Sequence, residues 1–269
     1  MIIDEEIDKY IELGLNEVDA TAKVCGEIIL NKIAKSVKAR NVTIKGGVVM
    51  MNLSKDLRRA TRDLDLDFIK YSLSDSSIVD FINKLNDVDS DIKLTIKYPI
   101  KKLKHQDYDG KRVNLDFFDS SGKKYNLKMD IGIHKNLELE QEEYCFDFNS
   151  INENVILFIN SKEQILSEKL KSILKFGATS KRYKDIFDIY YLININPVDN
   201  AKLKLLIDNY IINDNEMWEN SYDDIYNRLS NTFENKEYYS ELSNARDNWL
   251  EMSVDDVINV ILKYIKIFE

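Results

Sequence analysis

Residues 62–68 carry the side chains best suited to chemistry in this sequence. The run Arg-Asp-Leu-Asp-Leu-Asp-Phe alternates acidic and apolar residues, which predicts a β-strand. Successive side chains of a strand point to opposite faces, so Asp63, Asp65 and Asp67 would share one face. Carboxylates two residues apart are about 6.6–6.8 Å apart along a strand, close enough for two to bind one magnesium ion. A solvated strand face is the alternative, and an isolated Asp-x-Asp would favour it.

A glycine pair precedes this segment. Residues 41–45 predict a short strand that ends at Gly46-Gly47, and residues 48–57 predict a helix. Glycines allow backbone N–H groups to approach phosphates, and a helix N-terminus favours anions. Carboxylates on the next strand would hold the magnesium that bridges those phosphates. A tight turn is the alternative for the glycine pair alone, since the sequence has neither a P-loop nor a Rossmann motif.

A third carboxylate has two candidates. Residues 125–133 predict a strand whose polar face carries Asp130, and Asp116 stands on another strand of the same kind. A two-metal phosphoryl-transfer site requires an acid from a neighbouring strand, which completes the metal cage and accepts the proton of the attacking hydroxyl. We assign this role to Asp130 and keep Asp116 as its rival. A single acid on a polar strand face otherwise has no function.

The third cluster of charged residues is helical. Ser161 begins a capping box and Gly177 suits a helix C-cap, so residues 161–177 predict a helix that carries Lys169. A second helix, predicted over residues 180–193, carries Asp185 and Asp188 one turn apart. A functional interpretation places the lysine on nucleotide phosphates, oriented by an aspartate of the second helix. The alternative is a set of ordinary ion pairs on a helix surface.

Composition limits the metal sites, partners and cellular locations that fit this sequence. Two histidines and two distant cysteines are too few for a histidine-rich zinc site, and we expect Cys25 and Cys145 to be buried apolar residues. The net charge of −9 argues against a nucleic-acid partner, but the acids concentrate at both ends and leave a mildly basic middle. Neither a membrane-spanning run nor a secretory signal is visible, so we expect a cytoplasmic protein without a membrane partner.

The remaining pattern predicts an α+β fold in two parts. Three alternating segments separated by turn residues predict a strand meander over residues 92–100, 111–118 and 125–134. From Ser161 onward the pattern is helical, with further helices predicted over residues 199–212, 221–233, 235–249 and 253–268. We therefore divide the chain into an α+β core with N-terminal helices, residues 1–155, and a helical C-terminal domain, residues 156–269.

Taken together, these motifs resemble a known family. Five short segments occur in the order found in the AbiEii/AbiGii toxins of the DNA polymerase β-like nucleotidyltransferase superfamily: Gly46-Gly47 and residues 59–65, 129–131, 167–170 and 182–188. The resemblance implies a nucleotidyltransferase-type mixed β-sheet core with flanking helices, and a helical C-terminal domain that completes the active site.

The resemblance also implies a role for each matched residue. In the N-terminal part, Asp63 and Asp65 match the metal-binding Asp-x-Asp, and Asp130 matches the third metal-binding carboxylate. The nucleotide-binding residues implied there are Gly46, Gly47 and Arg59. Asp67 has no assigned role.

In the helical part, Lys169 matches the active-site lysine, which also binds the nucleotide. Asp185 and Asp188 match the Lys-Asp-x-x-Asp motif that supports this lysine.

The activity implied is transfer of a nucleoside monophosphate from an NTP, either GTP or a pyrimidine NTP, to an RNA acceptor. The cofactor would be Mg²⁺ or Mn²⁺, and the acceptor would be the tRNA 3′ end, so that transfer blocks translation in a toxin–antitoxin or abortive-infection system against phage. A cognate antitoxin would counter the toxin and need not bind it directly.

Two other functions compete with this one. The same fold can modify a small molecule or a protein, and the acidic C-terminal helices suit a cationic substrate better than RNA. A catalytically silent nucleotide-binding regulator is the third interpretation, which the presence of the acids and of Lys169 disfavours. A polymeric acceptor would follow a basic run that is otherwise a solvated edge strand: Lys93, Lys97, Lys101, Lys102, Lys104, Lys111 and Arg112.

Overall fold

A computed structural model describes residues 1–103, 110–134, 141–195 and 197–268. The chain divides into two compact units, Met1–Asn160 and Ser161–Glu269. This division follows the last strand of the sheet, whereas the sequence-based division at residue 155 falls inside that strand. Lys104, one of the basic residues expected to meet the acceptor, lies outside the described residues.

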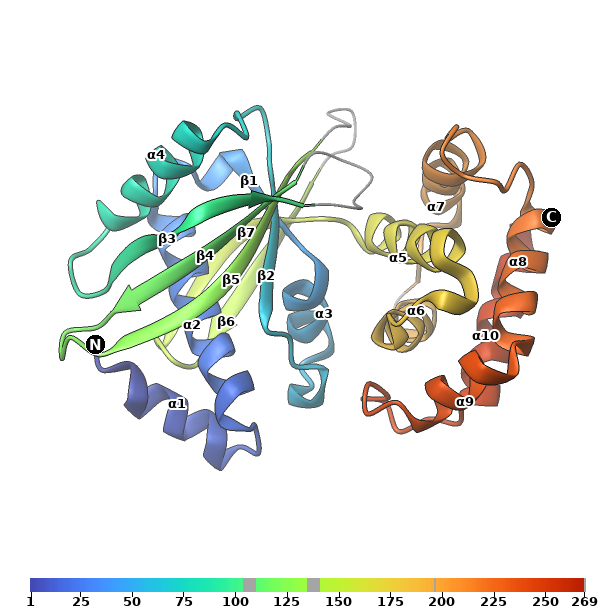
Figure 1. Ribbon diagram of the computed structural model, residues 1–269, viewed down its shortest axis with the longest axis horizontal. Helices are drawn as coiled ribbons and strands as arrows, with labels where there is room; N and C mark the ends of the chain where they lie inside the picture. The colour runs from blue at the N-terminus through green and yellow to red at the C-terminus, as the bar shows by residue number, and fades with distance from the viewer. Residues whose placement is uncertain (104–109, 135–140, 196, 269) are drawn as a thin grey trace. The chain divides into compact units, whose positions relative to one another are not determined.

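The core of the N-terminal unit is a mixed sheet, which has seven strands in the described part of the chain (Figure 1). The strands are β1 (Val42–Lys45), β2 (Asp63–Phe68), β3 (Lys93–Lys102), β4 (Lys111–Phe118), β5 (Lys124–Ile133), β6 (Glu142–Phe148) and β7 (Glu153–Ile159). Their order across the sheet is β3-β4-β5-β2-β1-β7-β6. The antiparallel trio β3, β4 and β5 is the predicted meander, and β2 joins it by pairing parallel to β5.

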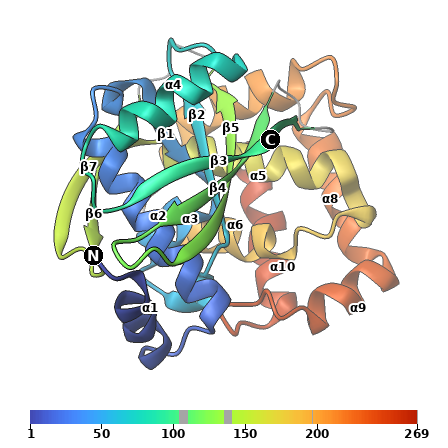
Figure 2. The ribbon, with the colours of Figure 1, turned by 60° about the vertical axis from the view of Figure 1, so that its left-hand side comes forward.

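Alternation in β2 gives the sheet one apolar and one polar face. Leu64, Leu66 and Phe68 are buried, and helices cover the sheet on this unit (Figure 2). These helices are α1 (Ile3–Glu12), α2 (Glu17–Lys35), α3 (Gly46–Ser54) and α4 (Asp75–Asn86). The α2 helix packs against β5 and β7, α4 packs against β3, and α3 contacts β1 and β2. The aspartates of β2 occupy the opposite, polar face.

Strands β6 and β7 are absent from the sequence-based prediction. The alternation of β6 is nevertheless visible, because Phe146 and Phe148 are buried while Cys145 and Asp147 are exposed. Cys145 lies on the exposed side of β6, so the expectation that both cysteines are buried is wrong for this one and confirmed for Cys25. The β7 strand pairs parallel to β1, the strand that precedes the glycine pair, and antiparallel to the edge strand β6.

The C-terminal unit is helical. Its α-helices in the described residues are α5 (Lys162–Phe176), α6 (Tyr183–Ile195), α7 (Asn200–Ile207), α8 (Tyr222–Glu234), α9 (Lys236–Asn244) and α10 (Val254–Ile265). The predicted signals of α5 are confirmed, since Ser161 Oγ accepts a hydrogen bond from Gln164 N at 3.2 Å and Gly177 ends the helix with φ of +52°. The helix predicted over residues 235–249 ends earlier, at Asn244, which places Trp249 in a connecting segment.

The predicted fold class is therefore confirmed: an α+β core with a mixed sheet and flanking helices is followed by a helical C-terminal half. Within the described residues, every helix is too short or too polar to cross a membrane.

Candidate active site

Asp65 lies directly against the start of α3. A Cβ placed on Gly46 would come within 2.3 Å of Asp65 Oδ2, and Gly46 has φ of +66°, a backbone conformation that favours glycine. Gly46 is also the first residue of α3, so the Asp65 carboxylate meets the positive end of a helix. A glycine is therefore required here for two reasons: its backbone conformation and the close approach of the carboxylate.

Asp130 is the cross-strand neighbour of Asp65. The parallel pairing of β2 and β5 sets Asp65 opposite Asp130, and directly opposed residues point to the same face. Asp116 is instead opposite Asn126, which donates a hydrogen bond to it at 2.5 Å, at a level of the sheet that precedes the start of β2. The register therefore favours Asp130 over Asp116 as the partner of Asp65.

Arg112 of β4 holds Asp130 in a bidentate ion pair, with Nε 2.8 Å from Oδ1 and Nη2 2.7 Å from Oδ2. The hydrogen bond to Asp130 raises the pKa of Arg112 above its usual value, and the charges of Asp63 and Asp65 add to this effect. The arginine is thus permanently charged within the field of all three carboxylates. Its side chain is 37% exposed, so it remains accessible to an anionic ligand.

Lysines accompany the other two acids of β2. Lys128 Nζ is 2.6 Å from Asp63 Oδ1, and both side chains are about one-third exposed. Lys45 Nζ is 2.7 Å from Asp67 Oδ1 in a buried pair. Sequence reasoning missed both lysines, although their positions carried a signal. Lys128 precedes Asp130 by two residues in the same strand and so shares its face, and Lys45 directly precedes the glycine pair.

The two other nucleotide-binding candidates of this unit differ in their surroundings. A Cβ on Gly47 would lie 2.5 Å from Thr61 Oγ1, so this glycine serves the packing of α3 against the segment before β2. Arg59 belongs to a short 3₁₀ turn, Leu57–Arg59, and is only 3% exposed. Its guanidinium is therefore buried, and the nucleotide-binding role of Arg59 stays a prediction.

The donor atoms of this region suit a hard divalent cation. Asp63 and Asp65 offer carboxylate oxygens on one strand face, which are ligands that Mg²⁺ and Mn²⁺ prefer. Among the described residues, however, no three His, Cys, Asp or Glu side chains are arranged as a ready-made metal cage. Asp63 and Asp130 instead pair with Lys128 and Arg112. The carboxylates thus fit a cation by their chemistry, and neighbouring side-chain cations now balance their charge.

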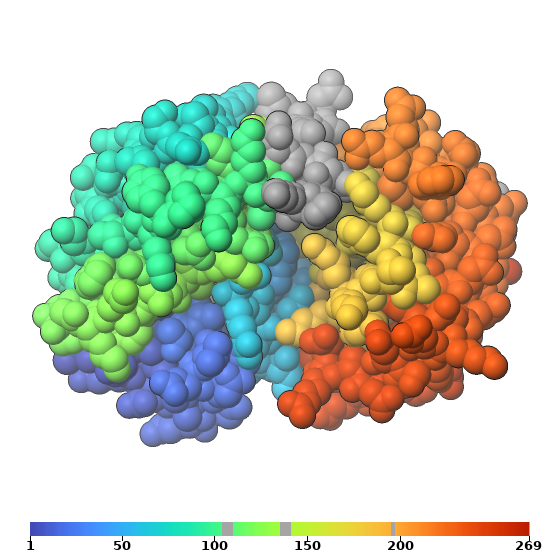
Figure 3. All heavy atoms as spheres, viewed as in Figure 1, coloured from blue at the N-terminus to red at the C-terminus, as the bar shows by residue number. Residues whose placement is uncertain are grey.

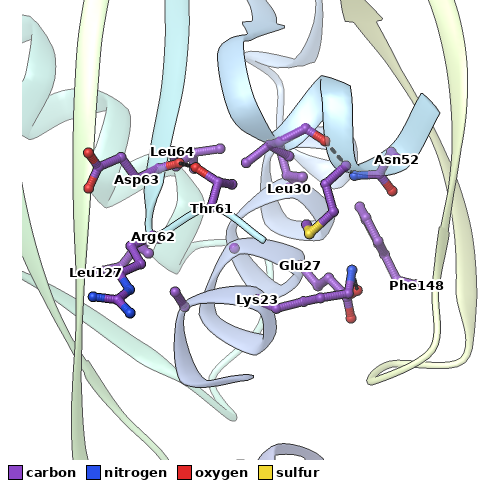
Figure 4. Close-up of a pocket in the computed structure, with 14 residues that line it drawn as sticks. Lys23, Glu27, Leu30, Asn52, Thr61, Arg62, Asp63, Leu64, Leu127 and Phe148 are labelled. Atoms are coloured by element: carbon purple, nitrogen blue, oxygen red, sulfur yellow. Dashed lines mark hydrogen bonds and ion pairs between the residues drawn. The ribbon is translucent and has the colours of Figure 1, made fainter. Parts of the chain in front are cut away.

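The pocket beside this region is too small for a nucleotide. It is mainly apolar, lies between α2, α3 and the sheet, and has a cavity volume of about 10 Å³, close to the space for one water molecule. Asp63 borders it but directs its carboxylate away from Lys23 and Glu27 (Figure 4). A larger cavity of about 470 Å³, bordered by α1, α2 and the β6–β7 turn, contains none of the predicted site residues.

In the C-terminal unit, α5 and α6 bring the three predicted residues together. Lys169 Nζ lies 2.5 Å from Asp185 Oδ1 and 2.8 Å from Asp188 Oδ2. The side chains are 9%, 13% and 0% exposed respectively, so this is a buried cluster and not a set of surface ion pairs. Lys184, which is one turn before Asp188, instead lies 3.8 Å from Asp247.

Trp249 completes this cluster, and sequence reasoning missed it. Its indole Nε1 donates a hydrogen bond of 3.1 Å to Asp188 Oδ1, and its ring packs against Tyr191 with centroids 5.2 Å apart. The residue follows α9 in a connecting segment, and nothing in its local sequence indicates which aspartate it meets. Asp188 is therefore fully buried and contacts two donors, the Lys169 ammonium and the Trp249 indole N–H.

Comparison with known proteins identifies the class and then the family. Residues 28–260 match a nucleotidyl transferase family, so the chain is a nucleotidyltransferase by class. It belongs to the family described as nucleotidyl transferase AbiEii toxin, type IV TA system, whose match spans most of the chain.

One solved structure that is similar to this chain is an antigenic nucleotidyltransferase-like protein from Paracoccidioides brasiliensis. The TM-score is 0.47 at 18% identity, over 82% of this chain and 91% of that chain. No curated protein matches the chain in sequence.

Proposed function

We propose that this nucleotidyltransferase transfers a nucleoside monophosphate from GTP or a pyrimidine NTP to the 3′ end of tRNA and thereby blocks translation. The observation that supports this most directly is the contact between Asp65 and Gly46. At this contact a strand carboxylate, a glycine whose missing side chain permits the close approach, and a helix N-terminus come together. A triphosphate and its divalent cation need these three elements together.

Asp63 and Asp65 would hold Mg²⁺ or Mn²⁺, which supplies charge neutralisation for the phosphates during transfer. The backbone at the start of α3 would bind the phosphates, because its N–H groups have no partner within the helix. Asp130, held by Arg112, would accept the proton of the attacking hydroxyl. Pyrophosphate leaves as the bond from the α-phosphorus to the acceptor oxygen forms.

The cluster around Lys169 would act on the same reaction. Its two aspartates hold the ammonium in one orientation, which suits a cation that offsets charge on the phosphates in the transition state. Asp185 and Asp188 are positioning residues in this scheme, because they contact the lysine and not the substrate.

The test is transfer of label from each α-labelled NTP, with magnesium or manganese and total bacterial tRNA. Asp65→Asn keeps the shape of the side chain and should lower the rate at least about a hundredfold, the size of effect seen when one preorganised charge contact is removed. Asp116→Asn, on β4, is the matched control and should retain activity. Label in tRNA with the wild type and the control, but not with Asp65→Asn, would support the proposal.

Other outcomes would redirect or reject it. Label on a protein or on a small molecule would keep the site and change the acceptor. No transfer with any nucleotide, metal or acceptor would reject the enzyme mechanism in favour of a nucleotide-binding regulator.

For the cellular role, we propose that an antitoxin counters this activity in the cytoplasm without binding the toxin. Expression of the wild type should then arrest growth, and expression of Asp65→Asn should not. Co-expression with a cognate antitoxin should restore growth, and purification of the tagged toxin should not recover the antitoxin. Stoichiometric recovery of the antitoxin would overturn the absence of direct binding.

A further inference from the structure

The register of the sheet sorts the basic residues of β3 and β4 between its two faces. Directly opposed residues of neighbouring strands project to the same face. One row across the polar face consists of Lys101, Arg112, Asp130 and Asp65. The next row on that face consists of Lys97, Asn114, Lys128 and Asp63. Two rows thus connect the edge strand to the carboxylates.

The other basic residues of this run project elsewhere. Lys102 is opposite Lys111, which is opposite Ile131. Ile131 is opposite the buried Leu66, so this row belongs to the apolar face. Lys111 also forms an ion pair with Asp75 at the start of α4. The basic run in the sequence is therefore not one patch, because neighbours such as Lys101 and Lys102 serve opposite faces.

The lysines on the polar face are available to a ligand. Lys97 and Lys101 are exposed, and neither forms an ion pair with a described residue, whereas Lys124 and Lys128 of β5 do. Tyr98 lies between Lys97 and Lys101, where the register of β3 against β4 shifts and strict alternation of faces is interrupted, and it is 65% exposed. In Figure 3, residues of β3, coloured green, lie at the surface of the N-terminal unit. Proteins bind single-stranded nucleic acid with unpaired cations and exposed aromatic rings, and this segment of β3 supplies both.

We propose that the polar face of the sheet binds single-stranded RNA that enters over β3. RNA phosphates would bind Lys97 and Lys101, and a base would stack on Tyr98. The 3′ end of the RNA would reach Asp65. Strand spacing places Lys101 three strands, or about 14 Å, from Asp65, a span that a few nucleotides cover. This inference rests on the proposed function, because it assigns the path by which the RNA acceptor reaches the same carboxylates.

Protection of an edge strand is the competing explanation for these lysines. It makes a different prediction. A lysine that merely prevents edge-to-edge pairing acts from either face of β3, so Lys101 and Lys102 would be equivalent. An RNA path along the polar face makes them unequal, although they are adjacent in sequence, both exposed and identical in type.

The experiment measures binding of a labelled single-stranded RNA oligonucleotide and of tRNA by fluorescence anisotropy, without NTP or metal. Lys97→Glu and Lys101→Glu should each raise the Kd about tenfold, and each should lower the slope of log Kd against log salt by about 0.7, the value per phosphate of a single strand. Lys102→Glu is the matched control and should change the Kd less than about twofold. Tyr98→Ala should weaken binding without changing the salt slope.

Equal effects of Lys101→Glu and Lys102→Glu, or no effect of either, would overturn the path. Tighter binding of an RNA duplex than of the single strand would overturn its single-stranded character. Because binding is measured without catalysis, the two proposals fail separately. If binding responds as expected but the wild type transfers no nucleotide, the proposed function fails alone. If transfer proceeds and Lys101→Glu leaves the KM for RNA unchanged, the path fails alone.

Discussion

The two clusters of charged residues in this nucleotidyltransferase differ in how firmly they are held. In the N-terminal unit, Asp63 and Lys128 pair on a strand face where both side chains are about one-third exposed. In the C-terminal unit, Lys169 is enclosed by Asp185 and Asp188, and Asp188 has no exposed surface. An exposed ion pair contributes little stability and exchanges partners readily, whereas a buried one is costly to break.

Under the proposed function, this difference would give the two clusters different roles. A cation site must accept and release its ion, so partners such as Lys128 that can give way are suitable there. A lysine that offsets charge in a transition state works best in a fixed position, because reorganisation during the reaction would cost free energy. We therefore expect variants of the buried cluster to act on stability first, and variants of the strand face to act on substrate and metal.

The largest effect is expected for Asp188→Asn. The substitution removes the charge that binds Lys169 Nζ and leaves the indole N–H of Trp249 facing an amide. We expect the free energy of unfolding to fall by about 3 kcal/mol, as when one partner of a buried pair is lost. Urea denaturation followed by circular dichroism measures this change. The control is Asp185→Asn, which should lower the free energy of unfolding less because Asp185 is partly exposed. An equal loss for the two variants would show that burial does not distinguish the two aspartates.

Gly46→Ala should act mainly on activity. The new Cβ would collide with Asp65 Oδ2 and displace it, and we expect transfer to fall about a hundredfold. The alanine also incurs backbone strain of about 1 kcal/mol at positive φ. Gly122→Ala separates the two effects, because Gly122 has φ of +80° and open space around its Cβ position. In thermal unfolding, Gly122→Ala should show the loss of stability from strain alone, and Gly46→Ala should lose more because Asp65 is also displaced. Only Gly46→Ala should lose activity, and retained activity would show that Gly46 is not part of the site.

The smallest effect is expected for Lys128→Ala. Without this ammonium, Asp63 has no competing cation from β5, so the magnesium concentration at half-maximal rate should fall about two- to fivefold, the size of coupling in an exposed pair. Stability should change little. A magnesium titration of the transfer rate measures the change in magnesium requirement. Lys124→Ala is the control, because Lys124 pairs with Asp116. An unchanged or higher magnesium requirement would show that Asp63 does not bind the ion.

The sequence predicted some features of the site and missed others for identifiable reasons. Alternation in residues 62–68 was sufficient to place Asp63 and Asp65 on one face, because that pattern is local. It was insufficient to choose between Asp130 and Asp116, because both occupy polar positions of neighbouring strands. The parallel pairing of β2 with β5 sets Asp130 opposite Asp65, and these two strands are separated in the chain by a helix and two further strands.

By itself, then, the sequence determined the elements that carry the chemistry. Strand alternation, the glycine pair and the caps at Ser161 and Gly177 are set by neighbours within a few residues, so they are readable from the chain. The family motifs added roles for Lys169 and its aspartates, which the structure brings together as one buried cluster.

Only the tertiary structure decided which residues meet. Register between strands distant in sequence placed Asp130 beside Asp65 and separated Lys101 from Lys102, and packing of the helical unit brought Trp249 to Asp188. The physical reason is that pairing and packing depend on the burial of whole apolar faces, and a shift of one residue in register would reverse every side chain of a strand. That constraint acts across the sheet, and local sequence does not contain it.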